Sequence, residues 1–147
     1  MSTVKNPIIV ISVFLWIGFV CSISFLEAWL KFQAPGITLS LGLGIGRLVF
    51  NALNKVEWVF AIAILISTFI NSRALLSFNK ISFYIPLIAL IIQTIWLLPA
   101  LDARAEMHIL NQVVPPSNLH FYYVGVEALK IISLALFGIS QFKKQAS

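Results

Sequence analysis

The stretch ISFYIPLIALIIQTIWLLPAL (residues 81–101) decides the fold, because none of its residues is charged. Lys80 precedes it and Asp102 follows it, so a charged residue marks each end of the run. A helix of this length, at about 1.5 Å per residue, crosses the roughly 30 Å of hydrocarbon in a lipid bilayer. The sequence therefore predicts a membrane-spanning helix over 81–101.

Three further stretches have a similar character. Residues 7–30 contain a single charged residue, Glu27, and residues 119–142 are largely apolar on either side of Glu127 and Lys130. Residues 56–72 complete the set. We expect these four spans to form an all-α, integral membrane four-helix bundle, and the single transmembrane domain to take up residues 1–147.

The second span needs an extension, because its uncharged run, 58–72, gives only about 22 Å of helix. In the stretch before it a polar residue recurs at every fourth position, at Arg47, Asn51 and Lys55. This spacing places the three side chains on one face of a helix. It predicts either an amphipathic helix lying at the membrane surface or a helical extension of the span itself.

Composition also favours lipid as the solvent. Apolar residues make up 60% of the 147 residues and charged residues 10%, compared with about 45–50% and about 25% in soluble domains. A soluble protein of this size has too much surface to cover with so few charges. The net charge of +5 forms no dense basic patch, so we expect no nucleic-acid partner.

The distribution of Lys and Arg predicts the orientation. One side of the predicted bundle has the N-terminus, the 71–80 turn and the C-terminal tail, and it carries five basic residues and no acid: Lys5, Arg73, Lys80, Lys143 and Lys144. The opposite side, with loops 31–55 and 102–118, carries four. The positive-inside rule then places both termini in the cytoplasm and the protein in the cytoplasmic (inner) membrane.

All five acidic residues fall in the outer half of the bundle in this orientation. Glu127 lies about 12 Å into its helix, where an unpaired charge costs at least about 2.5–3.5 kcal/mol. One interpretation is a polar cavity that opens outward, with Glu127 and Lys130 at its floor; the other is a set of structural ion pairs. The candidate ligand-binding residues are Glu27, Lys31, Arg47, Lys55, Glu57, Gln93, Asp102, Tyr123, Glu127 and Lys130.

Metal and phosphate sites have weaker signals. His108 and His120 are candidate metal ligands together with Asp102 or Glu106, but the two histidines lie at the edge of the spans and lack helical spacing. The GLGIG motif (42–46) follows no predicted strand, so it indicates a flexible or closely packed segment rather than a phosphate loop. We expect no metal and no cofactor.

Two segments carry a family resemblance: FLEAWLKFQAPG (25–36) and GLGIGRLVFNALNKVEW (42–58). With the four spans, they resemble small bacterial four-span membrane proteins of unknown activity. They are also similar, more distantly, to the transmembrane-protein-205-like and anthrone-oxygenase-like groups. The resemblance implies a four-helix bundle in the cytoplasmic membrane and no particular activity.

Three functions fit these features. The first is binding of an amphiphilic small molecule or of a partner complex through the outward cavity, in the lipid bilayer. The second is a small membrane enzyme in which Glu127 and Lys130 are catalytic and act on an apolar substrate. The third is a transporter or channel, which four helices would form only as a homo-oligomer.

Overall fold

The computed structural model describes residues 2–4, 6–71 and 78–144. Its first helical stretch begins at Asn6, whose side-chain oxygen accepts hydrogen bonds from the backbone N–H groups of Ile8 and Ile9. Pro7 occupies the first helical position, where its fixed φ suits a helix and its missing N–H costs nothing. The stretch continues without a break as α1 (Pro7–Val20), the π-helix η1 (Cys21–Glu27), α2 (Ala28–Leu30) and the 3₁₀ turn η2 (Lys31–Gln33).

The second long helix, α3, runs from Leu39 to Asn71. The sequence left open whether the stretch before the second span is a separate surface helix or an extension. The structure shows an extension, because α3 is continuous through Arg47 and Lys55. At 1.5 Å per residue, α3 is about 50 Å long, well beyond the thickness of a hydrocarbon core.

The third stretch comprises α4 (Phe78–Ile92), the π-helix η3 (Gln93–Leu97) and α5 (Leu98–Ile109). Pro99 explains the change from α-helix to π-helix at η3. Its nitrogen has no hydrogen to donate, and its ring clashes with the carbonyl four residues earlier. The helix continues to Ile109, so the prediction that a loop begins at Asp102 is wrong. Beyond Ile109 the chain turns at Asn111, whose φ of 54° is left-handed and lets Gln112 donate to the Met107 carbonyl at 2.9 Å.

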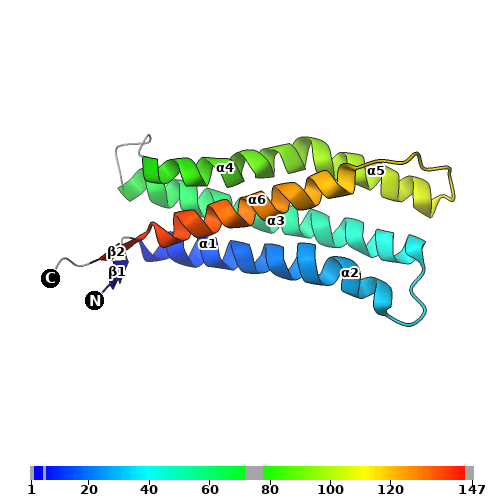
Figure 1. Cartoon of the computed structure of the whole chain (residues 1–147), viewed down its shortest axis with the longest axis horizontal. Helices are drawn as coiled ribbons and strands as arrows, with labels where there is room; N and C mark the ends of the chain where they lie inside the picture. Colours follow the sequence, from blue (N-terminus) through cyan, green and yellow to red (C-terminus); the bar gives the residue numbers. More distant parts are fainter. Residues whose placement is uncertain (1, 5, 72–77, 145–147) are drawn as a thin grey trace.

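The fourth helix, α6 (Leu119–Ile139), ends three residues before the predicted boundary. Beyond it the short strand β2 (Phe142–Lys144) pairs antiparallel with β1 (Ser2–Val4). This pairing holds both ends of the chain at one end of the bundle, called here the terminal end (Figure 1). Lys5 and Arg73, which contribute to the predicted orientation, lie outside the described residues.

The helices run lengthwise beside one another as a four-helix bundle (Figure 1). Contacts join α1 to α3 and α6, α4 to α6, and α3 to α5. The connections 34–38 and 110–118 lie together at the end opposite the termini, called here the loop end. Each of the four helical stretches, Pro7–Gln33, Leu39–Ile70, Ser82–Ile109 and Leu119–Ile139, is long and apolar enough to cross a membrane.

Candidate functional site

The most unusual feature of the bundle is a group of ionisable side chains that is completely buried. Glu57 on α3 is 1% exposed, and Glu127 and Lys130 on α6 are 0% exposed. Lys130 Nζ forms ion pairs with Glu57 Oε1 and, at 3.1 Å, with Glu127 Oε2. The predicted pairing of Glu127 with Lys130 is therefore present, and Glu57 is a second carboxylate on the same ammonium group.

Gln93 connects the members of this group. Its amide oxygen accepts a hydrogen bond from Lys130 Nζ at 2.6 Å, and its amide nitrogen donates to Glu127 Oε1 at 2.9 Å. Gln93 is the first residue of the π-helix η3, and a π turn commonly marks a functional site. Both ends of its amide are used, so the orientation of this side chain is fixed by Lys130 and Glu127 together.

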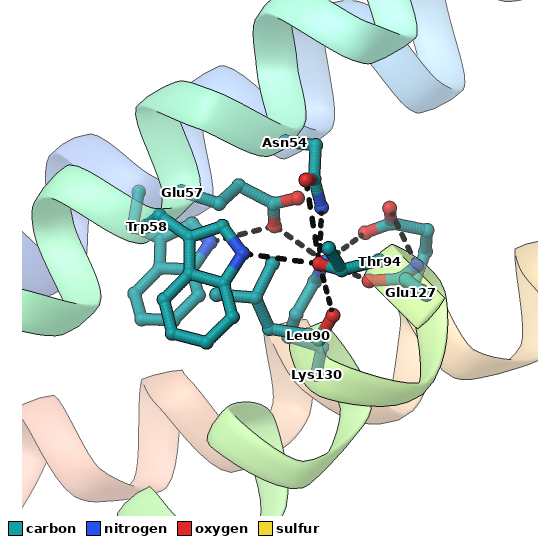
Figure 2. Close-up of polar contacts among 9 residues, drawn as sticks. Asn54, Glu57, Trp58, Leu90, Thr94, Glu127 and Lys130 are labelled. Carbon is teal, nitrogen blue, oxygen red and sulfur yellow. Dashed lines mark hydrogen bonds and ion pairs between the residues drawn. The ribbon is translucent and has the colours of Figure 1, made fainter. Parts of the chain in front are cut away.

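The first helix contributes Trp16, which is fully buried and donates its indole N–H to Glu57 Oε1 at 2.7 Å. We call Trp16, Glu57, Gln93, Glu127 and Lys130 the buried network. Its members come from all four helical stretches, so this network ties the bundle together. Figure 2 shows Glu57 of α3 beside Glu127 and Lys130 of α6.

A second set of hydrogen bonds centres on the Thr94 hydroxyl (Figure 2). Asn54 donates to it at 2.9 Å and the Trp58 indole at 3.0 Å, while Thr94 itself donates to the Leu90 carbonyl at 2.7 Å. These contacts hold η3 against α3 beside the buried network. They support the position of Gln93, the residue next to Thr94.

The polar interior contrasts with an apolar exterior. Large apolar side chains on the outer surface are widely exposed, for example Ile95 (73%) and Phe121 (73%). In a soluble protein, charged side chains are almost never fully buried and the exterior is rich in them. A bundle that faces lipid is expected to place its ionisable groups inside, where they pair with one another.

A separate pocket of about 160 Å³ lies at the loop end. Its walls are mostly apolar and include Phe32, Phe50, Leu98 and Leu101. Gly42 and Gly46 let the helices approach closely here, since a Cβ on Gly42 would overlap the Phe32 ring and one on Gly46 would lie 3.1 Å from Lys31 Nζ. The sequence left open whether this segment is flexible or closely packed, and the contacts at Gly42 and Gly46 show close packing.

Two charged groups at the pocket are held by ion pairs. Arg47 binds Asp102 through two hydrogen bonds of 2.7 and 3.0 Å, and its Nη2 lies 3.5 Å from a Glu106 carboxylate oxygen. Lys31 Nζ pairs with Glu27 at 3.1 Å, and it also lies 5.5 Å from the centre of the Phe50 ring. Arg47 and Asp102 lie on the parts of α3 and α5 that extend toward the loop end, so the helix extensions build this side of the pocket.

Tyr123 lies between the pocket and the buried network. Its side chain lines the pocket and packs edge-on against Phe50, with ring centres 5.4 Å apart. It also lies beside the carboxyl groups of Glu127 and Glu57. Glu127 and Lys130 are not among the pocket-lining residues, so the structure places them behind Tyr123 and not at the exposed floor of a cavity.

The ten candidate ligand-binding residues therefore separate into groups. Four line the pocket: Lys31, Arg47, Asp102 and Tyr123. Four belong to the buried network: Glu57, Gln93, Glu127 and Lys130. Glu27 pairs with a pocket residue, and Lys55 is exposed.

The sequence did not identify Trp16 and Thr94 as members of these hydrogen-bonded groups, because an indole or a hydroxyl in an apolar run has no distinctive spacing.

The two candidate metal ligands lie near the loop end. His120 lines the pocket and His108 is exposed in the last turn of α5. Among the described residues, no three His, Cys, Asp or Glu side chains are close enough to hold a metal ion, so these histidines have no ligand set to join.

Comparison of this chain with family models, curated proteins and solved structures gives no match. The resemblance to the small four-span groups stays a prediction.

Proposed function

We propose that this chain is an integral protein of the cytoplasmic membrane that binds one end of an amphiphilic small molecule in the loop-end pocket. The observation that carries the proposal is the composition of that pocket: apolar walls next to the charged groups of Lys31, Arg47 and Asp102. A site that combines an apolar hollow with a few convergent polar groups suits a ligand with the same two characters.

The lengths of the helices support a position near the membrane boundary. At 1.5 Å per residue α6 is about 31 Å long, which matches the hydrocarbon core, whereas α3 is about 50 Å long. The excess of α3 and α5 lies at the loop end, together with Arg47 and Asp102. With the termini in the cytoplasm, as the Lys and Arg distribution favours, the pocket faces the outer boundary of the membrane.

The size of the pocket limits the ligand. A cavity of about 150 Å³ holds one benzene ring, and the loop-end pocket is of similar volume. We infer that a ring or a short section of acyl chain enters it, while the remainder of the ligand lies outside the protein. Lys31 and Arg47 bring N–H donors to the pocket while each is paired with a carboxylate, so a ligand whose polar end accepts hydrogen bonds fits best.

Catalysis by Glu127 and Lys130 receives less support. A general acid or base must come within hydrogen-bond reach of its substrate. Both side chains are fully buried and are absent from the pocket lining. We therefore favour binding over the enzyme hypothesis.

The experiment is native mass spectrometry of the detergent-extracted protein with two added probes that share a tail, dodecanoate and dodecyltrimethylammonium. Ala105, buried in the pocket wall, is changed to phenylalanine to fill the pocket. Ala103→Phe is the matched control, because Ala103 is exposed on the same helix and does not line the pocket.

We expect dodecanoate to bind wild-type protein and Ala103→Phe with a stoichiometry of one, and to bind Ala105→Phe at least tenfold more weakly. The cationic probe should bind more weakly than dodecanoate. Equal dodecanoate affinity of Ala105→Phe and Ala103→Phe would contradict the loop-end pocket as the binding site. The same spectra report the oligomeric state and any co-purified lipid or partner.

A further inference from the structure

The buried network has an unequal number of acids and bases. Glu57 and Glu127 supply two carboxyl groups, and Lys130 supplies one ammonium group. Three further side chains of the described residues contact them, and all three are uncharged: Trp16 from α1, Gln93 from η3 and Tyr123 from α6. With both acids ionised, the network would carry one uncompensated negative charge.

That charge would lie out of contact with bulk water. Glu57, Glu127 and Lys130 are at most 1% exposed, and many large apolar side chains are exposed on the outer surface of the bundle. Burying an ion without a partner costs much solvation free energy, so such a group is normally neutralised by gain or loss of a proton. The network can be neutral while Lys130 keeps its charge if one carboxyl group holds a proton.

One buried carboxylate oxygen of the network accepts no hydrogen bond from the described residues. Glu57 Oε1 accepts from the Trp16 indole and pairs with Lys130, and Glu127 Oε1 accepts from Gln93. Glu127 Oε2 is buried and makes no hydrogen bond in the described part of the chain, although Lys130 Nζ lies 3.1 Å away. A proton on Glu127 would leave the donors to Glu57 in place.

We propose that the buried network is a proton-binding site, in which Glu57 and Glu127 together hold one proton while Lys130 is protonated. Binding forms one O–H bond on a carboxylate with a proton from water, and no electron is transferred. Because the two carboxyl groups share one ammonium group, the proton belongs to the pair. This proposal does not depend on a ligand in the loop-end pocket.

The number of protonated carboxyl groups can be counted by infrared spectroscopy. The carbonyl stretch of a neutral carboxylic acid is separate from the bands of a carboxylate, and ¹³C-labelled glutamate identifies the glutamate signal. The measurement uses purified full-length protein in detergent at pH 7, with folding checked by circular dichroism. We expect one protonated glutamate per wild-type chain.

Charge balance then predicts how the count of protonated glutamates changes in a series of variants. Lys130→Met removes the cation and should give two protonated glutamates per chain. Glu57→Gln and Glu127→Gln each leave one carboxylate with Lys130 and should give none. Glu106→Gln is the matched control, because Glu106 pairs with Arg47 outside the network; its count should stay at one.

The wild-type count alone is decisive even if a variant does not fold. A count of zero would mean that both acids are ionised, and a count of two would mean that neither acid balances the charge of Lys130; either overturns the proposal. It would also be overturned if Glu106→Gln abolished the signal, or if the signal persisted unchanged in both network glutamine variants.

Discussion

Replacing Lys130 with methionine tests whether the buried network holds the four helices together. Methionine has similar length and keeps the apolar part of the side chain, but it has no ammonium group. The substitution removes the ion pairs to Glu57 and Glu127 and the 2.6 Å hydrogen bond to Gln93. The two carboxyl groups can then stay buried only as neutral acids.

The size of the effect follows from these lost contacts. Removing one partner of a buried ion pair costs about 3–5 kcal/mol. The Gln93 amide oxygen also loses its donor, and a buried acceptor without a partner costs about 1–3 kcal/mol by itself. We therefore expect the free energy of unfolding to fall by at least about 3 kcal/mol, a large part of the usual 5–15 kcal/mol.

The assay is reversible unfolding in mixed micelles by titration with sodium dodecyl sulfate, followed by circular dichroism. Lys55→Met is the matched control, because Lys55 is exposed on α3 and should lose no more than about 0.5 kcal/mol. The triple variant Glu57→Gln, Glu127→Gln, Lys130→Met should regain much of the loss, since no unpaired charge is left. Two results would refute this reasoning. One is a free energy of unfolding of Lys130→Met within about 1 kcal/mol of wild type; the other is a triple variant that is less stable than the Lys130→Met single variant.

Two further predictions concern single contacts. Trp16→Phe should lower the free energy of unfolding by about 1–3 kcal/mol, because Glu57 loses the indole N–H; an unchanged unfolding midpoint in the same titration would contradict the role of that bond. In a double-mutant cycle, Arg47→Met and Asp102→Asn should show little coupling in unfolding free energy, because the pair is partly exposed. A coupling as large as that of a buried ion pair would contradict this expectation.

The sequence predicts the helices well because hydropathy alone determines where the chain can cross lipid. The uncharged run 81–101 and the span 7–30 lie within helical stretches of the structure, and α3 and α6 cover most of the other two predicted spans. Helix ends were less predictable. Asp102 and Glu106 continue α5 because a charged residue ends an apolar run without ending a helix, and Asn111 supplies the left-handed turn that follows α5.

The candidate site could be predicted only in part. The pairing of Glu127 with Lys130 follows from their spacing on one helix. The ion pair of Lys130 with Glu57 depends on how α3 and α6 are aligned, which no local pattern encodes. The indole of Trp16 and the hydroxyl of Thr94 act through contacts between helices, so they have no signature in a single segment.

The separation of pocket and network is the main change that the structure makes to the prediction. The sequence left open an outward cavity with Glu127 and Lys130 at its floor or a set of structural ion pairs. Tyr123 instead lines the pocket and covers the network from that side. The phenol ring of Tyr123 lies between the pocket and the network. It packs against Phe50 of α3, and the spacing of residues along α6 cannot reveal a contact with another helix.

Photo-crosslinking tests the central claim, a pocket for an amphiphile in a membrane-spanning bundle, most directly. The probe is a fatty acid that carries a diazirine in its chain, added to the protein in lipid nanodiscs and mapped by peptide mass spectrometry. The account predicts saturable attachment to pocket residues such as Phe32, Phe50 or Leu101. Attachment confined to the exposed exterior, for example at Ile95 or Phe121, would contradict it.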